Sequence, residues 1–405
     1  NELKKIIFRL NKRGRKVWRR NMNNYVTQLN LGQIRLLFGI GVVKETPAEL
    51  RRVDVKYPFI VTDRFLREGG LLSSLIKILT EENYRFEVFD KVTPDPGGSI
   101  VDEAVAYLKQ KECDCVIGFG GGSVMDVAKC VAAMAVNEGK LMDYDHANSA
   151  HKEFTKSSLA LIQIPTTSGT GSEMSPYAVI TNEQEGRKAT IGSPMLLSRI
   201  ALVDPELVKN LPKGATASTG MDALTHCIES YTTKKSLETP NPIIDALALK
   251  GIHYLYKNLY KAYREGSNLS VREKVMWGSV IGGIVLQYGS GASHGLGNVL
   301  GGEYHVPHGT AVGMLLPYVM EFNKDVCGRR YGEIADELGL KSVEELIQRM
   351  KELKENLEIP TLLHYVKDTN EISRLAQLAV LDKCTRINGK KIEPADAESI
   401  YKKAL

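Results

Sequence analysis

Four potential metal ligands lie in the second half of this 405-residue chain. Asp222 and His226 are four residues apart in a segment typical of a helix, so both side chains leave the same helix face. His294 and His308 follow in a glycine-rich segment. One carboxylate and three imidazoles suit iron(II) or zinc and leave any further coordination position to water or a substrate. The set predicts a divalent-metal site, although each residue taken singly also fits a helix-start carboxylate or a core histidine.

A glycine-rich turn precedes these residues in the chain and follows an apolar segment of strand length. Gly120, Gly121 and Gly122 allow an anion to approach the backbone closely, and the helix that follows offers free N–H groups at its positive end. Ser123 and Asp126 have the spacing of a capping box for that helix. The pattern predicts a phosphate-binding turn, and an ordinary tight turn with a helix cap is the alternative.

A second loop of small residues, 165–173, follows the next apolar segment. The hydroxyls of Thr166, Thr167 and Ser172, with unhindered amides, could bind ribose, phosphate or a nicotinamide amide. An ordinary Gly/Ser/Thr connection is the alternative. Two such loops after successive strands, followed by the metal ligands, favour a dinucleotide site.

Asp63 closes another apolar segment, residues 59–63. A carboxylate there would accept hydrogen bonds from a ribose hydroxyl and repel a 2′-phosphate, which favours NAD over NADP. The competing hypothesis is that Asp63 caps a helix starting at Arg64.

These segments resemble the iron-containing alcohol dehydrogenase family, from about Gly39 to the C-terminus. The motifs that carry the resemblance are residues 120–129, 166–173, 220–226 and 294–308. It implies an N-terminal dinucleotide-binding domain and a C-terminal helical domain, with NAD(P) and a divalent metal in the cleft between them. The implied metal ligands are Asp222, His226, His294 and His308, and the implied cofactor contacts are Asp63, Gly121, Gly122, Ser123, Asp126, Thr166, Thr167, Ser172 and Lys188.

Two positions depart from the family pattern. Many members have a histidine four residues after the third ligand, whereas this chain has Asn298. Asparagine cannot act as an acid or base near neutral pH, so the proton must leave by another route, such as bound water, a ribose hydroxyl or His305. The family's Asn-Pro-Arg near the C-terminus is also absent, and residues 387–390 replace it.

The pattern of apolar residues predicts two domains. Short apolar segments alternate with amphipathic ones as far as about residue 204, which is typical of helices around a parallel sheet, and helical periodicity dominates afterwards. We expect an α/β dinucleotide-binding domain over residues 22–208 and an all-α metal-binding domain over 209–405. The expected strands are 57–61, 84–88 and 115–119, and the expected helices are 70–80, 101–111, 124–136, 218–232, 242–263, 271–285, 343–357 and 372–382.

The charge of the chain is concentrated at its beginning. Residues 1–20 hold nine basic residues and one acidic residue, which leaves 44 basic and 47 acidic residues for the rest and argues against nucleic acid as the main ligand. Residues 1–21 have one apolar helical face with cations opposite, so they form a basic amphipathic extension that could dock on a partner. The alternative is that Met22 is the natural start. Scattered cysteines and the absence of an 18-residue apolar run favour a cytoplasmic protein.

The expected function is reversible hydride transfer between a small alcohol and its aldehyde or ketone. The cofactor would be NAD, with NADP as an alternative, and the metal iron(II) or zinc. Other hypotheses are a glycerol-dehydrogenase-like or dehydroquinate-synthase-like metalloenzyme, or an assembly component that docks through residues 1–21. A homodimer or higher homo-oligomer is the expected state.

Overall fold

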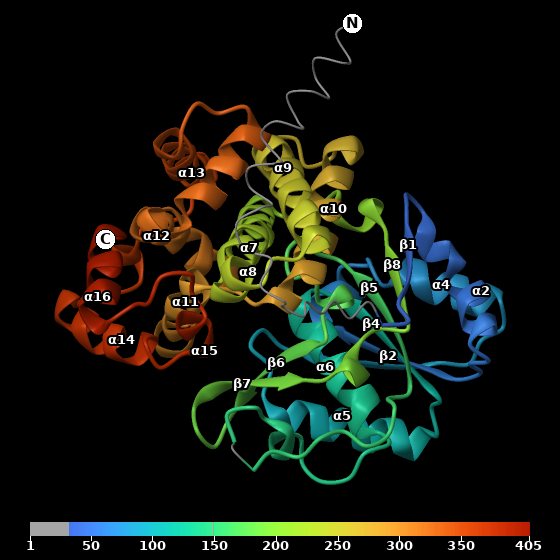
Figure 1. The fold of residues 1–405 in the computed structure, drawn as a ribbon. Coiled ribbons are helices and arrows are strands. Elements are labelled where there is room, and N and C mark those ends of the chain that lie inside the picture. Colours follow the sequence, from blue (N-terminus) through green and yellow to red (C-terminus); the bar gives the residue numbers. More distant parts are fainter. Residues whose placement is uncertain (1–31, 149) are drawn as a thin grey trace, which may run out of the picture.

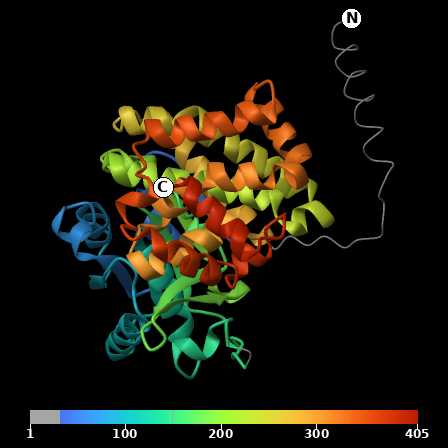
Figure 2. The same cartoon turned by 90° about the vertical axis from the view of Figure 1, so that its left-hand side faces the viewer.

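The computed structural model describes residues 32–148 and 150–405. The predicted amphipathic extension, residues 1–21, lies outside this range. Two parts are visible, an α/β part in blue to green and a helical part in yellow-green to red (Figures 1 and 2). None of the described helices is long and apolar enough to cross a membrane.

A six-stranded parallel sheet forms the centre of the α/β part, as the sequence predicts. Its strand order is β1-β8-β5-β4-β2-β3. The strands are β1 (Arg35–Phe38), β2 (Pro58–Asp63), β3 (Glu87–Val92), β4 (Cys115–Gly120), β5 (Ala160–Pro165) and β8 (Ile200–Val203). Because Gly120 pairs with Pro165 at the ends of β4 and β5, the carboxyl ends of the central strands meet at one edge. Ligands bind at that edge in open parallel sheets.

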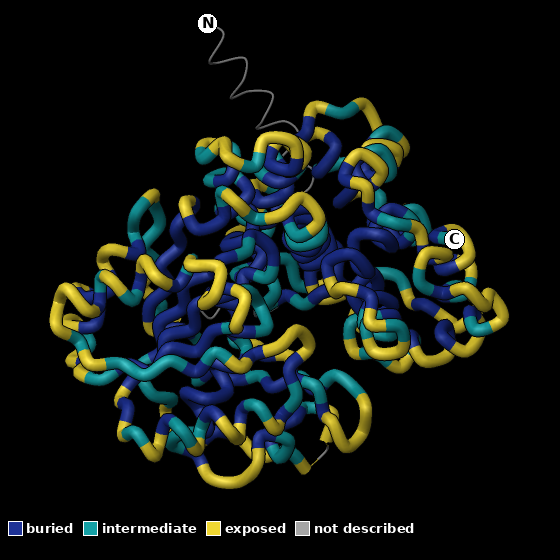
Figure 3. Tube along the Cα trace, turned by 180° about the vertical axis from the view of Figure 1, so that it is seen from behind, coloured by how far each residue is buried: buried dark blue, intermediate teal, exposed yellow. Residues whose placement is uncertain are grey.

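Both faces of the sheet are covered, because alternate residues of each strand point to opposite sides. Ile60 and Ile117 pack toward α2 (Thr46–Arg52) and α4 (Ser73–Glu81), whereas Phe59 and Val116 pack toward α5 (Gly98–Lys111) and α6 (Gly122–Met134). Buried residues therefore run through the middle of each part, and exposed residues gather on the outer loops (Figure 3).

The strand predicted over residues 84–88 is displaced in the structure, where β3 begins at Glu87. The Tyr84 N–H donates to the Leu79 carbonyl at 2.9 Å, and Asn83 has a φ of 58°. These residues end α4 in a left-handed turn. The chain therefore becomes extended, and the strand begins, only after this turn. A short α3 (Arg64–Glu68) begins at Arg64, as the capping hypothesis for Asp63 predicts. An antiparallel hairpin of β6 (Tyr177–Asn182) and β7 (Arg187–Gly192) is also present, without a sequence prediction.

The second half of the chain is helical, as predicted. Its main helices are α7 (Lys213–Thr232), α8 (Lys234–Glu238), α9 (Pro242–Arg264), α10 (Leu269–Val285), α11 (Ala292–Tyr304), α12 (His308–Leu338), α13 (Val343–Asn356), α14 (Ile372–Ala379), α15 (Lys383–Arg386) and α16 (Pro394–Lys403). Helix α11 and the 31-residue α12 are present without a sequence prediction. Their apolar contacts form one core with α7 and α9.

Helix α10 joins the two parts. Met276 and Val280 of α10 pack on Ala201 and Val203 of β8. A Cβ added to Gly171 would come within 2.5 Å of Gly283, so the loop after β5 contacts the helix backbone directly. With a φ of 58°, Gly171 also has a backbone conformation that favours glycine. The second small-residue loop is thus held between the sheet and the helical part.

Candidate active site

A cleft of about 880 Å³ opens at the carboxyl edge of the sheet. Its walls come from the ends of β2, β4 and β5, from α3, and from residues 206–212, which lead into the helical part. The predicted cofactor residues that line it are Asp63, Gly121, Gly122, Ser123, Thr166 and Thr167. The structure therefore brings both glycine-rich loops and the predicted ribose-binding carboxylate to one cavity.

The first glycine turn leads directly into α6. Gly121 occupies the N-cap position without a side-chain cap, so the predicted capping box of Ser123 and Asp126 is wrong. Asp126 instead accepts a hydrogen bond from the Val179 N–H of β6 at 2.9 Å. A Cβ added to Gly122 would lie 2.6 Å from Thr170, so the second loop packs against the first. The uncapped N–H groups of α6 remain available to an anion.

Asp63 is both a helix cap and a wall of the cleft. Its Oδ1 accepts the Leu66 N–H at 2.8 Å, which confirms the competing hypothesis of a helix N-cap. The cap fixes the carboxylate at the end of β2 and places it on the cavity side. The two interpretations of Asp63 are therefore compatible.

Four predicted cofactor residues do not line the cleft, namely Gly120, Asp126, Ser172 and Lys188. Gly120 is the buried last residue of β4, and Ser172 donates its hydroxyl hydrogen to Asp126 at 2.6 Å. Lys188 lies on β7, where its ammonium contacts the Asp95 carboxylate. The Lys188 charge acts on His308, so this lysine lies toward the four predicted metal ligands.

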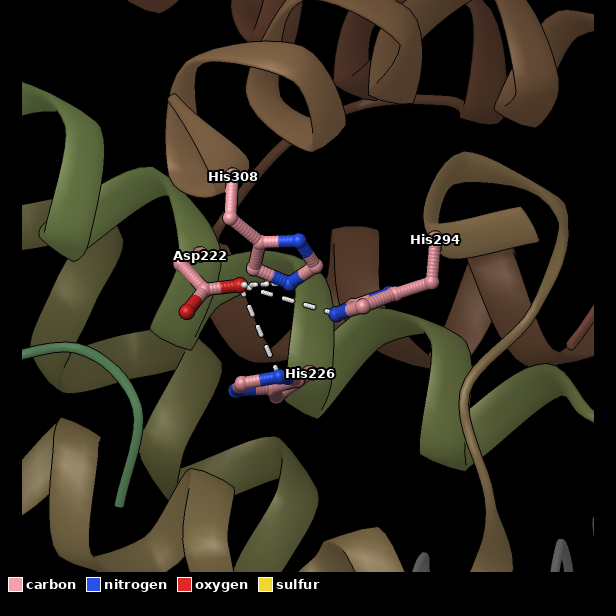
Figure 4. A group of neighbouring side chains, drawn as sticks. All are labelled: Asp222, His226, His294 and His308. Atoms are coloured by element: carbon pink, nitrogen blue, oxygen red, sulfur yellow. Dashed lines mark ion pairs between the residues drawn. The ribbon is translucent and has the colours of Figure 1, made fainter. Parts of the chain in front are cut away.

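The four predicted ligands converge on one point (Figure 4). Among the described residues, they are the group whose ligand atoms all lie within 4.8 Å of one another. The Asp222 Oδ1 is 3.5 Å from the Nε2 atoms of His226 and His294 and 3.6 Å from that of His308. Asp222 and His226 come from α7, His294 from the first turn of α11, and His308 from the start of α12.

Three of these side chains are deeply buried, and the His308 side chain is 48% exposed. His308 therefore marks the side from which a small molecule can reach the cluster. Gly309, the next residue, allows the start of α12 to approach α7, because a Cβ there would lie 2.2 Å from the Ser218 carbonyl oxygen.

Each charged group of the cluster changes the pKa values of its neighbours. Burial would raise the pKa of Asp222, but the histidines, His226 first, outweigh it and lower that pKa. Burial lowers the pKa of His226 to about 4. Burial also acts to lower the pKa of His294, but the negative charges of the Asp222 and Glu229 carboxylates outweigh it and raise the value to about 9. The cluster thus keeps a carboxylate and a neutral imidazole at neutral pH.

The donor atoms fit a divalent cation. The buried Asp222 Oδ1 and His294 Nε2 have no hydrogen-bond partner. An unpaired buried oxygen and nitrogen that face each other at 3.5 Å would be costly without a ligand between them. One carboxylate and three imidazoles match the preferences of iron(II) and zinc.

Glu229 is a buried residue of the site that was not predicted from the sequence. Its Oε2 lies 2.7 Å from the Nδ1 of His294, on the ring edge away from Asp222. Glu229 follows Asp222 and His226 on α7 at a spacing that keeps all three on one helix face. That i, i+4, i+7 spacing was the signal available in the sequence.

The two departures from the family pattern have defined structural surroundings. Asn298, one turn after His294 on α11, donates its amide to the Asp382 carboxylate at 3.1 Å. Asn388 is buried and exchanges hydrogen bonds with Asn323. His305, the alternative proton group, is an exposed residue at the end of α11.

The sequence model described as iron-containing alcohol dehydrogenase matches residues 34–205, and its C-terminal counterpart matches residues 216–405. Alcohol dehydrogenase 4 of Saccharomyces cerevisiae is 35% identical over 373 residues, which cover 91% of this chain and 96% of the yeast protein. The NAD-dependent methanol dehydrogenase of Bacillus methanolicus is 32% identical, over 91% of this chain and 97% of that protein.

A solved structure of a related reductase shows that the similarity extends to the fold. Sulfoacetaldehyde reductase from Bifidobacterium kashiwanohense, in complex with NAD⁺, superposes with a TM-score of 0.86 at 28% identity, over 94% of this chain and 99% of that one. Sequence and fold agree over nearly the whole length. With its parallel-sheet cleft and its cluster of one aspartate and three histidines, this chain belongs to the iron-containing alcohol dehydrogenase family.

Proposed function

We propose that Asp222, His226, His294 and His308 hold a divalent iron, with zinc as the alternative, and that the neighbouring cleft holds NAD. The observation that carries this assignment is the convergence of four ligand atoms, two of them buried without a hydrogen-bond partner. The reaction is the reversible oxidation of a small alcohol to its aldehyde or ketone. A bound divalent ion supplies Lewis-acid polarisation of the reacting oxygen, and bound NAD accepts or returns the hydride.

The chain's own residues bind and orient the reactants. The amides at the start of α6, after Gly121, face the cleft and would hold the cofactor phosphates. The Asp63 carboxylate would accept a hydrogen bond from the adenine ribose and disfavour the 2′-phosphate of NADP. Thr166 and Thr167 offer hydroxyls at the end of β5. The buried Thr167 Oγ1 has no partner in the protein, so it can bond to a cofactor group.

The substrate would enter beside the exposed His308 and meet the cluster next to the nicotinamide end of the cleft. Oxidation of the alcohol would break one C–H and one O–H bond, with bound NAD as the hydride acceptor and water as the proton acceptor. Asn298 does not take this proton, because its amide has no accessible pKa and already donates to Asp382. The structural relative in complex with NAD⁺ and the NAD-dependent methanol dehydrogenase support the choice of cofactor.

The test measures NADH and NADPH oxidation with a panel of short aldehydes and ketones. The protein is first stripped of metal by chelation and then refilled with iron(II) or zinc. We expect activity only after refilling, higher activity with NADH, and loss of metal binding in His226→Asn. His253→Asn, which changes a partly exposed histidine of α9, is the matched control. Metal-independent turnover, or no turnover with any carbonyl compound, would contradict the proposal.

We also propose a homodimer or higher oligomer in the cytoplasm. All six cysteines are free, which suits a reducing compartment. A soluble enzyme most often forms a symmetric dimer. Light scattering of the full chain and of a chain that starts at Met22 tests the oligomeric state. Co-sedimentation of the same two proteins with a cell extract tests whether residues 1–21 dock on a partner.

A further inference from the structure

The first turn of α11 is held by side chains from two distant parts of the chain. The N–H groups of Gly291 and Ser293 donate to the two carboxylate oxygens of Glu229, each at 2.6 Å. The Ala292 N–H between them donates to the Asn388 Oδ1 at 3.2 Å. Three successive amides that the helix itself cannot satisfy therefore find acceptors on α7 and on the C-terminal segment.

The same carboxylate also holds the side chain of a predicted metal ligand. The Glu229 Oε2 accepts a hydrogen bond from the Nδ1 of His294 at 2.7 Å. A carboxylate acceptor holds a proton on Nδ1, so Nε2, the atom that faces Asp222, is the ring nitrogen that can give up its proton and offer a lone pair to a metal. Glu229 thus fixes both the backbone that carries His294 and the orientation of its ring.

Asn388 is fixed in turn by a reciprocal amide pair. Its Nδ2 donates to the Asn323 Oδ1 at 2.8 Å, and the Asn323 Nδ2 donates back at 3.1 Å. Glu229, Asn323 and Asn388 are each at most 5% exposed. Gly291 permits both acceptors to approach, because a Cβ there would lie 3.0 Å from oxygens of Glu229 and Asn388.

We infer that Glu229 and Asn388 form a clamp that positions His294 for metal binding. This inference rests on the proposed metal site and adds two positioning residues to it. Glu229 acts on the ring and the backbone, whereas Asn388 acts on the backbone alone. Loss of Glu229 therefore weakens metal binding more than loss of Asn388, since partners of ligating histidines contribute about 10- to 100-fold in metal affinity.

The test measures zinc affinity by competition with a fluorescent chelator, together with the unfolding midpoint of the metal-free protein. Glu229→Gln keeps the shape of the side chain but loses an acceptor. We expect its zinc affinity to fall by about 10- to 100-fold. The zinc affinity of Asn388→Ala should fall by only a few-fold. Glu229→Asp keeps a carboxylate, so its zinc affinity should lie between those of Glu229→Gln and the wild type. Asp245→Asn, which alters a carboxylate paired with Arg330 in the same helical part, should keep wild-type zinc affinity.

Three outcomes contradict the clamp. One is wild-type zinc affinity in both Glu229→Gln and Asn388→Ala. A second is a lower unfolding midpoint without a change in affinity, which indicates a purely structural role. The third is a wild-type protein that binds no zinc or iron(II), which overturns the proposed metal site and the clamp with it. If Glu229→Gln does not fold, Glu229→Asp and Asn388→Ala carry the comparison.

Discussion

Ser172 donates its hydroxyl hydrogen to Asp126 across 2.6 Å and so ties the loop after β5 to helix α6. Both residues were predicted to contact the cofactor, yet neither lines the cleft. Their bond instead sets the distance between the two loops that form its walls. We therefore expect Ser172 and Asp126 to position the groups that line the cleft.

Ser172→Ala should loosen this connection. The lost hydrogen bond contributes about 1 kcal/mol, so we expect the KM for NADH to rise roughly fivefold with little change in kcat. Steady-state kinetics with varied NADH measures the effect. Ser158→Ala removes a similar hydroxyl, which bonds to the Met195 carbonyl, and should leave KM unchanged. An unaltered KM in Ser172→Ala would contradict a positioning role.

Asp63→Ser should shift the cofactor preference toward NADPH. Serine still caps α3, so the fold is kept, but the negative charge that faces a 2′-phosphate is removed. We expect the ratio of kcat/KM for NADPH to that for NADH to rise about tenfold. Asp368→Ser changes another capping aspartate and serves as the control. Equal ratios in the variant and wild type would show that Asp63 does not select the cofactor.

Metal binding should stabilise the fold. At a free metal concentration of 100 times Kd, binding to the folded state alone adds about 2.7 kcal/mol to the free energy of unfolding. We expect the unfolding midpoint of the chelated protein to rise on addition of zinc, with no rise in His226→Asn. His253→Asn should respond as wild type does. A rise that persists in His226→Asn would place the metal elsewhere.

The sequence predicts the parallel sheet and most long helices, because apolar periodicity follows from burial on one or both faces. It does not predict α11, because Gly295 and Gly297 resemble loop residues. In the structure these glycines allow close packing, since a Cβ on Gly295 would lie 2.0 Å from Thr385 and one on Gly297 would lie 3.0 Å from Val312. Only the tertiary contacts distinguish such a helix from a loop.

The site, too, can be predicted only in part from the sequence. The spacing of Asp222 and His226 on one helix identifies two ligands, and their chemistry predicts a metal. The α11 amides that Glu229 and Asn388 hold lie more than 60 residues away in the chain, so spacing cannot reveal those bonds. Asn388 stands in the segment that departs from the family's Asn-Pro-Arg pattern, and its buried contacts explain why an asparagine is present there.

Glu173 makes stability depend on pH. Burial raises the pKa of this carboxyl to about 7, and its Oε2 has no hydrogen-bond partner. The folded state therefore favours the protonated form: the stability that Glu173 contributes is fully present below the unfolded value of about 4.5 and is lost as the pH rises to 7. A shift of this size corresponds to about 3 kcal/mol.

Glu173→Gln removes this penalty, so the variant should gain stability over wild type at pH 8 and little at pH 4.5. Urea unfolding of the metal-free proteins at both values measures the difference. Glu355→Gln changes an exposed carboxylate and should give the same difference at both pH values. A Glu173→Gln gain that does not depend on pH would mean that folding does not raise the pKa of this carboxyl.

Asn298→His should introduce a titrating group into the reaction. The present amide donates to Asp382 at 3.1 Å, and a histidine that keeps this contact would have a pKa above its ordinary value, because the carboxylate favours the charged ring. We expect kcat/KM to gain an inflection above pH 6.5 and, at pH 7, a rise on the order of tenfold, since a positioned acid or base typically contributes more than that. The measurement is the pH profile of kcat/KM for aldehyde reduction.

The control adds Asp382→Asn to Asn298→His. This second change removes the carboxylate charge but keeps the cap on the Cys384 N–H, so the inflection should move to lower pH. Superimposable profiles for Asn298→His and wild type would show that position 298 does not exchange a proton with the substrate.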